Sequence, residues 1–352
     1  MKITWIVNNI NQIGGIEQVV CGLSNYFSKS LGHQVEIISI NTNSEAIPFF
    51  YIEESVGIRH CGLDWREQNF YKLYRLVSKI LTSLDSDVLI TCHPTISNAV
   101  LLNKKRFNGK IVVTQHSAND SFTKKRLLCN AFMFRMADAF VVLTETDRKL
   151  YEALKCPVRI IPNANFKLIH NHSTLNEKII LAAGRIETVK GFDILIDAFF
   201  MLANKYPDWN LCICGSGSEE KQLKKQISAR HLSDRVLLPG AVKNIDEYMC
   251  NASVFALSSR SEGFSLVLIE AMSHGLPIVS FNLPAVQEIC KGKGGLVAKQ
   301  RDAFEFASEL DKMLASDALR QKLGGEGIEL SKKYSVASIS ELWMELFQEL
   351  LI

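Results

Sequence analysis

The chain has 352 residues, more than one hydrophobic core usually supports, so its length predicts two domains of similar size. Hydrophobic residues make up 47% and charged residues 22% of the sequence, which excludes a disordered or fibrous protein. The net charge of +3 is too small to indicate nucleic-acid binding.

The start of the chain resembles neither a signal peptide nor a membrane anchor. Its apolar run, residues 3–7, is shorter than a signal-peptide core, and no stretch approaches the roughly twenty apolar residues that span a bilayer. Nine cysteines without a C-x-x-C pair indicate reduced thiols rather than a zinc site or a disulfide framework. Cys212 and Cys214 are expected on the same face of one strand. We expect a cytoplasmic protein.

The first half of the chain alternates strand and helix patterns, which indicates a parallel sheet. The pattern predicts strands over residues 3–7, 35–40, 88–91, 110–114, 137–144 and 159–164, and helices over 16–28 and 69–84. Gly14 and Gly15, between the first strand and helix, would let a ligand approach the backbone or simply form a tight turn. Because G-x-G-x-x-G is absent, a dinucleotide-dependent dehydrogenase is disfavoured. Residues 41–60 are interpreted as a variable loop.

His116 directly follows the strand predicted over 110–114. In doubly wound sheets ligands gather at the carboxyl ends of the strands, and Ser117, Asn119 and Asp120 extend a polar loop there. A histidine at this position could hydrogen-bond a sugar hydroxyl or move a proton near neutral pH, or it could be structural. His93, before Pro94, is a rival with a more structural character.

Basic residues cluster in three places of the first half. The clusters are Arg66, Lys72, Arg75 and Lys79 around one helix, Lys104-Lys105-Arg106, and Lys124-Lys125-Arg126. They could rest on an anionic membrane or bind an anionic lipid. Solvated helix and loop faces are the favoured interpretation.

The second half repeats the alternation after a polar linker over residues 163–177. Strands are predicted over 179–183, 210–214, 236–242, 254–257 and 278–281, with 282–288 and 294–297 completing the sheet. Helices are predicted over 192–204, 246–250, 302–314, 317–333 and 338–351.

Arg185 and Lys190 flank the loop between the first strand and helix of this half. An arginine fork and a lysine point charge suit a diphosphate leaving group. The alternative is two exposed loop cations.

Glu262 and Glu270 occupy the stretch that joins strand 254–257 to strand 278–281. The first lies in a loop and the second about two turns further along a helix that Gly275 caps. Free N–H groups of the first helical turn favour an anion between them, and carboxylates accept hydrogen bonds from sugar hydroxyls. A solvated loop glutamate and the polar face of a helix form the alternative.

The two glutamates, separated by seven residues, resemble the signature of the retaining glycosyltransferases of family 4. Gly14-Gly15, His116, Arg185 with Lys190, and Gly215 with Gly217 match that family in order and spacing. Ala164 stands where the family usually has glycine.

The resemblance implies an α/β fold of GT-B type, with two doubly wound Rossmann-like domains facing each other across a cleft. It assigns residues 1–165 to an acceptor-binding domain, 166–334 to a nucleotide-sugar domain, and 335–352 to a helix that packs back on the first domain.

The resemblance also implies roles for individual residues. His116 and Glu262 would orient the sugar, Glu270 would bind the ribose, and Arg185 with Lys190 would stabilise the departing diphosphate. The expected donor-binding residues are Gly14, Gly15, Gly184, Gly215, Gly240, Gly263, Phe264, Ser265, Leu266 and Glu270. No metal-ligand set is recognised, so no metal cofactor is expected.

The expected reaction moves a hexosyl or N-acetylhexosaminyl unit from a nucleotide-sugar, with UDP as the expected nucleotide, to a glycan acceptor. The acceptor is expected to be lipid-linked, in cell-surface polysaccharide biosynthesis, with peripheral contact at the inner face of the membrane. A sugar-nucleotide epimerase of similar architecture and a catalytically idle binding protein are the alternatives. The spacing of the glutamates and the presence of every charged position argue against both.

Overall fold

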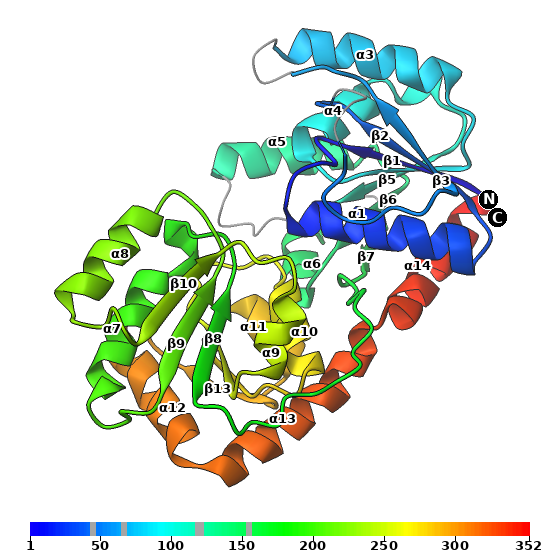
Figure 1. Cartoon of the computed structure of the whole chain (residues 1–352). Helices are drawn as coiled ribbons and strands as arrows, with labels where there is room; N and C mark the ends of the chain where they lie inside the picture. Colours follow the sequence, from blue (N-terminus) through cyan, green and yellow to red (C-terminus); the bar gives the residue numbers. More distant parts are fainter. Residues whose placement is uncertain (43–46, 65–68, 117–122, 153–156) are drawn as a thin grey trace. The chain divides into compact units, whose positions relative to one another are not determined.

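The structure is a computed structural model that describes residues 1–42, 47–64, 69–116, 123–152 and 157–352. The chain divides into two compact units, shown in Figure 1. The first unit comprises Met1–Phe166 and Ser335–Ile352, and the second comprises Lys167–Tyr334. Each unit contains one parallel sheet covered by helices, so the predicted doubly wound α/β class is confirmed.

The first unit is built on a seven-stranded sheet in the order β3-β2-β1-β4-β5-β6-β7, in which all pairings are parallel. The strands are β1 Lys2–Val7, β2 Gln34–Ser39, β3 Val56–His60, β4 Val88–Thr91, β5 Lys110–Thr114, β6 Ala139–Val142 and β7 Val158–Ile160. Runs of Val and Ile buried on both faces explain why the central strands form. The order reverses at β1, which pairs with both β2 and β4.

Helices cover both faces of this sheet. They are α1 Gly15–Asn25, continued by a π-helical turn over Tyr26–Ser30, α3 Phe70–Ser83, α4 Pro94–Leu102, α5 Lys124–Phe134, α6 Glu145–Tyr151 and α14 Val336–Leu351. Trp5 and Ile6 are neighbours on β1 and therefore point to opposite faces. Trp5 packs edge-on against Trp343 of α14, with ring centroids 5.8 Å apart, whereas Ile6 belongs to a core formed with α3 and α4.

The prediction of a loop over residues 41–60 is wrong in part, because Val56–His60 form the edge strand β3. Only Val56 of this strand is buried. An edge strand with mostly solvated side chains lacks the continuous apolar run of the central strands, so the hydrophobic pattern did not reveal it.

The second unit contains a six-stranded parallel sheet in the order β10-β9-β8-β11-β12-β13. The strands are β8 Ile179–Ala183, β9 Asn210–Cys214, β10 Val236–Gly240, β11 Val254–Leu257, β12 Ile278–Phe281 and β13 Gly295–Ala298. The helices are α7 Phe192–Ala203, α8 Glu220–Ala229, α9 Ile245–Cys250, α10 Leu266–Ser273, α11 Pro284–Cys290, α12 Ala303–Ala315 and α13 Asp317–Ser331.

One strand prediction in this unit is wrong. Residues 282–288 were expected to extend the sheet, but Pro284 begins helix α11. Proline suits the first helical position, where its missing N–H is not needed. Cys212 and Cys214 lie as expected on one face of β9, with free, buried thiols 3.8 Å apart.

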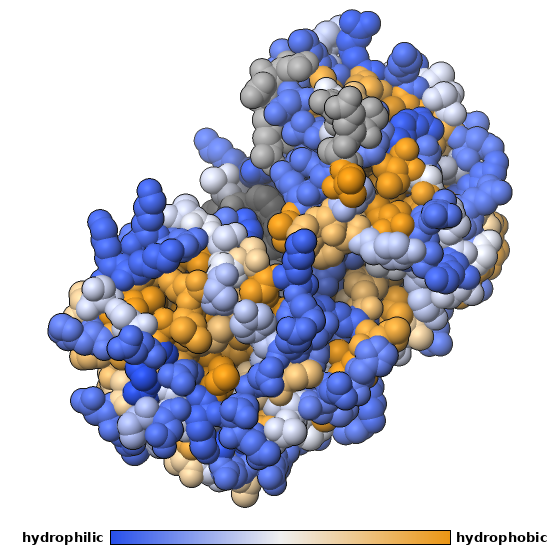
Figure 2. Space-filling model, viewed as in Figure 1, coloured by the Kyte–Doolittle hydropathy of each residue, from blue (hydrophilic) through white to orange (hydrophobic). Residues whose placement is uncertain are grey.

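The strand order of the second unit reverses at β8, which pairs with β9 on one side and β11 on the other. Connections that leave two neighbouring strands toward opposite faces open a crevice at their carboxyl ends. The loops after β8 and β11 begin there. Polar and charged side chains cover much of the face shown in Figure 2, with apolar patches between them, as is usual for a folded protein.

Candidate functional site

Lys190 and Glu262 meet at this strand-order reversal. The Nζ of Lys190, from the loop after β8, lies 2.7 Å from Oε1 of Glu262, from the loop after β11. Ser259 donates a hydrogen bond of 2.6 Å to the same oxygen. The side chains are 19% and 8% exposed, so each charge is largely withdrawn from water and compensated by the other.

Arg260 ties the two loops together. Its guanidinium donates to both carboxylate oxygens of Asp193, at 2.8 and 2.6 Å, and to the carbonyl of Thr188 at 2.6 Å. This pairing lowers the pKa of Asp193 against the opposing effect of burial and raises the pKa of Arg260. The Ser258 hydroxyl donates to the carbonyl of Lys190 at 3.0 Å. The backbone that carries Lys190 is thus fastened to the loop that carries Glu262.

Glycines of the loop after β9 allow that loop to pack closely against the loop that carries Lys190. A Cβ on Gly215 would lie 1.8 Å from the carbonyl oxygen of Gly184, and one on Gly217 would lie 2.2 Å from that of Ile186. The Gly215 N–H donates to the carbonyl of Gly240 at 2.8 Å, and Gly240 has a φ of +83° that favours glycine. Gly184, Gly215 and Gly240, which were predicted to bind the donor, lie where two backbones are in close contact.

The amino terminus of α10 directly follows the loop that carries Glu262. Leu266 begins the helix and Ser265 is its N-cap residue, and within the described part of the chain no side chain caps it. The Ser265 hydroxyl is buried and has no hydrogen-bond partner among the described residues. Phe264 packs against Tyr334 with ring centroids 5.8 Å apart, which holds the turn containing Gly263. The first N–H groups of any helix have no partner within the helix, and together with the Ser265 hydroxyl they suit an anion such as phosphate.

Glu270 lies on α10 and is buried. Its Oε2 is 3.8 Å from Nζ of Lys167, which also contacts Asp246 at 2.8 Å. His274 Nε2 lies 3.5 Å from the same Asp246 carboxylate. Burial lowers the pKa of His274, so its ring is neutral near pH 7. Within the described residues, Lys167 therefore compensates the charge of Glu270 whereas His274 does not.

Arg185 has a different ion-pair partner, within its own loop. Its side chain is mostly exposed and forms an ion pair of 2.8 Å with Glu187. The structure thus pairs Lys190 with Glu262 and Arg185 with Glu187, and the joint role of the two cations at a diphosphate stays a prediction.

His116 lies in the first unit, two residues beyond β5. Its Nε2 is 2.9 Å from the hydroxyl of Thr114, and its Nδ1 is buried without a geometric hydrogen-bond partner among the described residues. Burial lowers the pKa of His116 to about 4, and the nearby side chain of Asn163 opposes this shift through its hydrogen-bonding effect. The ring is therefore uncharged at neutral pH and suited to hydrogen bonding. Ser117, Asn119 and Asp120 lie outside the described residues.

Gly14 and Gly15 begin the first helix of the first unit. Gly14 is the N-cap residue of α1 with extended backbone, and a Cβ there would lie 2.4 Å from Oε2 of Glu17. Gly15 is the first helical residue. His93, the rival of His116, precedes Pro94 at the start of α4.

Comparison with known proteins identifies the family. A profile described as "Glycosyltransferase Family 4" matches residues 13–164, and one described as "Glycosyl transferases group 1" matches residues 166–330. An uncharacterized glycosyltransferase of Haemophilus influenzae is 31% identical over 352 residues, covering 97% of this chain and 98% of the relative. The chain belongs to this glycosyltransferase family.

Two further relatives of this glycosyltransferase have more specific names. The amylovoran biosynthesis glycosyltransferase AmsD of Erwinia amylovora is 26% identical, over 98% of this chain and 99% of the relative. An α-1,4-N-acetyl-D-galactosaminyltransferase of Campylobacter jejuni, named for an acceptor on undecaprenol diphosphate, is 24% identical over 99% of both chains.

Solved structures confirm the GT-B fold of the glycosyltransferase. Sucrose-phosphate synthase from Thermosynechococcus elongatus superposes with a TM-score of 0.86 at 20% identity, over 99% of this chain and 98% of the other. The pneumococcal O-GlcNAc transferase GtfA, solved with UDP and GlcNAc, gives 0.78 at 14% identity over 100% and 99%.

Sequence reasoning missed four residues of the second unit's site in this glycosyltransferase: Ser259, Arg260, Lys167 and Asp246. Arg260 could have been noticed because it lies two positions before Glu262. Lys167 and Asp246 are 79 residues apart and give no local signal.

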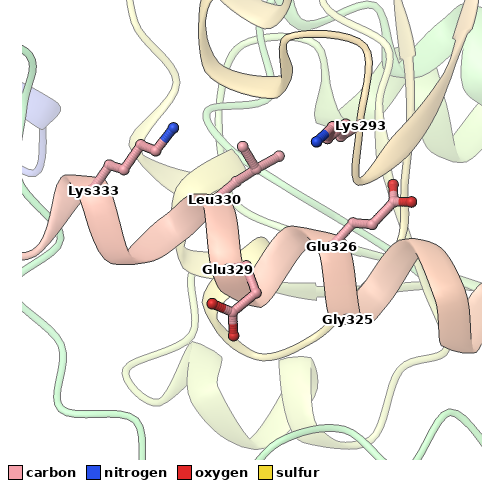
Figure 3. Close-up of a pocket in the computed structure, with 6 residues that line it drawn as sticks. All are labelled: Lys293, Gly325, Glu326, Glu329, Leu330 and Lys333. Carbon is pink, nitrogen blue, oxygen red and sulfur yellow. The ribbon is translucent and has the colours of Figure 1, made fainter.

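The basic clusters predicted from the sequence belong to the first unit. Of the predicted basic clusters, Lys104 pairs with Asp138 at 2.8 Å, Lys105, Arg106, Lys125 and Arg126 are exposed, and Arg66 lies outside the described residues. A hollow of about 440 Å³ on α13 is lined by Lys293, Gly325, Glu326, Glu329, Leu330 and Lys333 (Figure 3). None of those six residues belongs to the predicted donor site.

Two further observations concern metals and membranes. In the described part of the glycosyltransferase, no cluster of three or more His, Cys, Asp or Glu residues has the geometry of a metal site. Among the described helices, none combines the length and apolar character that crossing a bilayer requires.

Proposed function

We propose that this glycosyltransferase transfers a hexosyl or N-acetylhexosaminyl unit from a UDP-sugar to a lipid-linked glycan, with retention of anomeric configuration. The product would enter cell-surface polysaccharide. The proposal needs no metal, because protein cations and helix N–H groups would carry the negative charge of the leaving diphosphate.

The contact between Lys190 and Glu262 carries this proposal. A half-buried ammonium and a buried carboxylate 2.7 Å apart, beside an uncapped helix start, form a preorganised polar site. When the donor binds, Lys190 would turn to the diphosphate and Glu262 would accept hydrogen bonds from sugar hydroxyls. Lys190 would then exchange a carboxylate for the negative phosphate, and hydroxyl donors would satisfy the hydrogen bonds of Glu262.

The other predicted residues receive roles within the same proposal. Arg185, which is exposed, would move to the diphosphate as a second cation. Glu270, held by Lys167, would bind the ribose. His116 would orient the sugar as a neutral hydrogen-bonding ring, since its pKa of about 4 leaves it uncharged.

Donor and acceptor are proposed from the family and from the names of relatives. GtfA was solved with UDP, the Erwinia relative is named for amylovoran biosynthesis, and the Campylobacter relative is named for an undecaprenol diphosphate acceptor. Because the assigned family consists of transferases, transfer is favoured over the epimerase alternative.

The decisive experiment measures nucleoside diphosphate released from UDP-, GDP- and ADP-sugars, with and without membrane lipid extract. Release from one UDP-sugar that requires extract supports the proposal, and NMR of the product anomeric proton tests retention. Isomerised sugar without diphosphate release would establish the epimerase instead. Consumption of a different nucleotide's sugar would overturn the UDP assignment.

A further inference from the structure

Helix α5 of the first unit carries large apolar side chains on its outer surface. Leu128 is 73% exposed and Phe132 is 67% exposed, and Met136, just beyond the helix, is also exposed. These residues are spaced by four and therefore lie along one face. Cys129 lies on the same side and is exposed. Figure 1 shows α5 at the margin of the first unit.

The opposite face of α5 is already used for packing. Phe134 is buried against Phe140, with ring centroids 5.0 Å apart, and the buried Asn130 accepts a hydrogen bond from Asn98 at 3.3 Å. Phe132 and Leu128 are each two positions from one of these anchors, about 200° around the helix axis. The apolar stripe formed by Leu128 and Phe132 thus points away from the core of the first unit, and these side chains are not buried in that core.

The charged residues of α5 and its carboxyl-terminal flank, up to residue 137, all have the same sign. Between residues 124 and 137 the sequence contains four basic residues, Lys124, Lys125, Arg126 and Arg135, and no acidic one. Lys125 and Arg126 are exposed near the start of α5 and Arg135 at its end. Protruding apolar side chains flanked by cations are the pattern of a helix that lies in the interface of an anionic bilayer. The core of a protein interface, in contrast, is usually depleted of charge.

We propose that the outer face of α5, made of Lys125, Leu128, Phe132, Arg135 and Met136, seats the enzyme on an anionic lipid surface. Leu128, Phe132 and Met136 enter the boundary between head groups and acyl chains, while the basic side chains contact lipid phosphates. The inference deepens the proposed function, on which it rests for its purpose: a lipid-linked acceptor lies in such a surface.

The test is co-flotation of the full-length protein with vesicles. Vesicles of phosphatidylcholine and phosphatidylglycerol are compared with vesicles of phosphatidylcholine alone. The wild type should float with the anionic vesicles, and Leu128→Ser/Phe132→Ser should bind at least about tenfold more weakly, since two large apolar side chains no longer leave water. Lys125→Glu/Arg135→Glu should lose the preference for anionic vesicles. Phe304→Ser is the matched control, because Phe304 on α12 of the second unit is also 73% exposed.

Three results would overturn the proposal. They are failure of the wild type to float with either vesicle, flotation of the Leu128/Phe132 variant equal to that of the wild type, and equal weakening by Phe304→Ser. A wild-type dimer that Leu128→Ser/Phe132→Ser converts to monomer would show a protein contact instead, and circular dichroism confirms that each variant is folded.

Calorimetry with UDP separates this proposal from the donor assignment. UDP binding without flotation would refute only the proposed lipid-binding role of α5. Flotation without UDP binding would refute only the donor assignment.

Discussion

At the scale of single residues, the ion pair between Lys190 and Glu262 is the feature on which catalysis is expected to depend most. Lys190→Met and Glu262→Gln should each lower turnover by about 10²- to 10³-fold, as does loss of a group that stabilises transition-state charge. Steady-state release of nucleoside diphosphate measures the effect. Because the two residues act as a unit, the double variant should be little worse than either single variant.

The exposed pair Lys205–Asp311 provides the matched control for that prediction. Its N to O distance is also 2.7 Å, but its side chains are more exposed and belong to neither loop of the candidate site. Lys205→Met should leave turnover unchanged, because exposed ion pairs contribute little. Normal turnover in Lys190→Met, or fully additive losses in the double variant, would contradict the assignment.

His116 gives a pH-dependent prediction. The unfolded chain binds a proton at this imidazole near pH 6.5, whereas burial keeps the folded protein's ring neutral down to about pH 4. Its contribution to stability is therefore complete above pH 6.5 and is lost as the pH falls toward 4. The difference in unfolding free energy between wild type and His116→Gln should shift by on the order of 2 kcal/mol across this window. Urea unfolding at several pH values measures it, and a constant difference would refute the assigned burial.

At the scale of elements, Arg260 is expected to position the loop that carries Lys190. Arg260→Ala removes the bonds to Asp193 and to the carbonyl of Thr188. Turnover should fall by about tenfold to a hundredfold, because a catalytic group displaced by a fraction of an ångström loses much of its effect. Asp193→Asn should produce a similar loss, and Arg260→Lys should restore little, since lysine lacks the planar fork.

A kinetic comparison separates this positioning role from a general loss of stability. If Arg260 acts through Lys190, then combining Arg260→Ala with Lys190→Met should add almost nothing to the loss in kcat/KM. Independent, multiplicative losses in kcat/KM would show that Arg260 stabilises the fold without positioning Lys190.

The glycine loop after β9 makes a second prediction at this scale. Gly215→Ala places a methyl group 1.8 Å from the carbonyl oxygen of Gly184, so the two backbones must separate. Thermal unfolding should show a loss of about 2 kcal/mol or more, together with weaker UDP binding. Gly325→Ala on α13 is the control, because nothing lies within 4 Å of the added Cβ and alanine favours the helix by roughly 0.5–1 kcal/mol. Equal stability of the two variants would contradict this close contact.

At the scale of the whole molecule, the last helix belongs to the first unit although it follows the second in the sequence. Trp343 on α14 is buried against Trp5 and Phe347. Trp343→Ala should cost about 3–5 kcal/mol, the usual loss for a buried aromatic side chain. Calorimetric unfolding should show the first unit melting earlier while UDP still protects the second unit. Loss of UDP binding in the folded variant would indicate that α14 also maintains the donor site.

Much of the fold could be predicted from local patterns. The strands over 88–91, 110–114, 254–257 and 278–281 were located with their bounds, because continuous apolar runs between turns mark buried parallel strands. β3 was missed because an edge strand needs few apolar residues, and α11 was misread because its seven residues span too few turns for a clear helical period.

The candidate site could be predicted only as a set of residue types. The spacing of Glu262 and Glu270, with Lys190 in a strand-to-helix loop, pointed to a nucleotide-sugar site and to the family that comparison confirms. The same reasoning assigned Lys190 and Arg185 to one diphosphate, which stays a prediction, and it did not foresee that Lys190 pairs with Glu262 and Arg185 with Glu187. Which cation meets which carboxylate depends on side-chain direction, which spacing along the chain does not specify.

The sequence by itself determined two parallel α/β halves and the family, because periodicity, turn residues and motif spacing are local properties of the chain. Tertiary structure alone decided that Lys167 compensates Glu270, that Gly215 lies against Gly184, and that α5 turns Leu128 and Phe132 outward. Each of these contacts or exposures depends on elements distant in the sequence. Only the packing of the sheets and helices brings those elements together. That packing decides whether a given side chain stabilises or destabilises the folded protein.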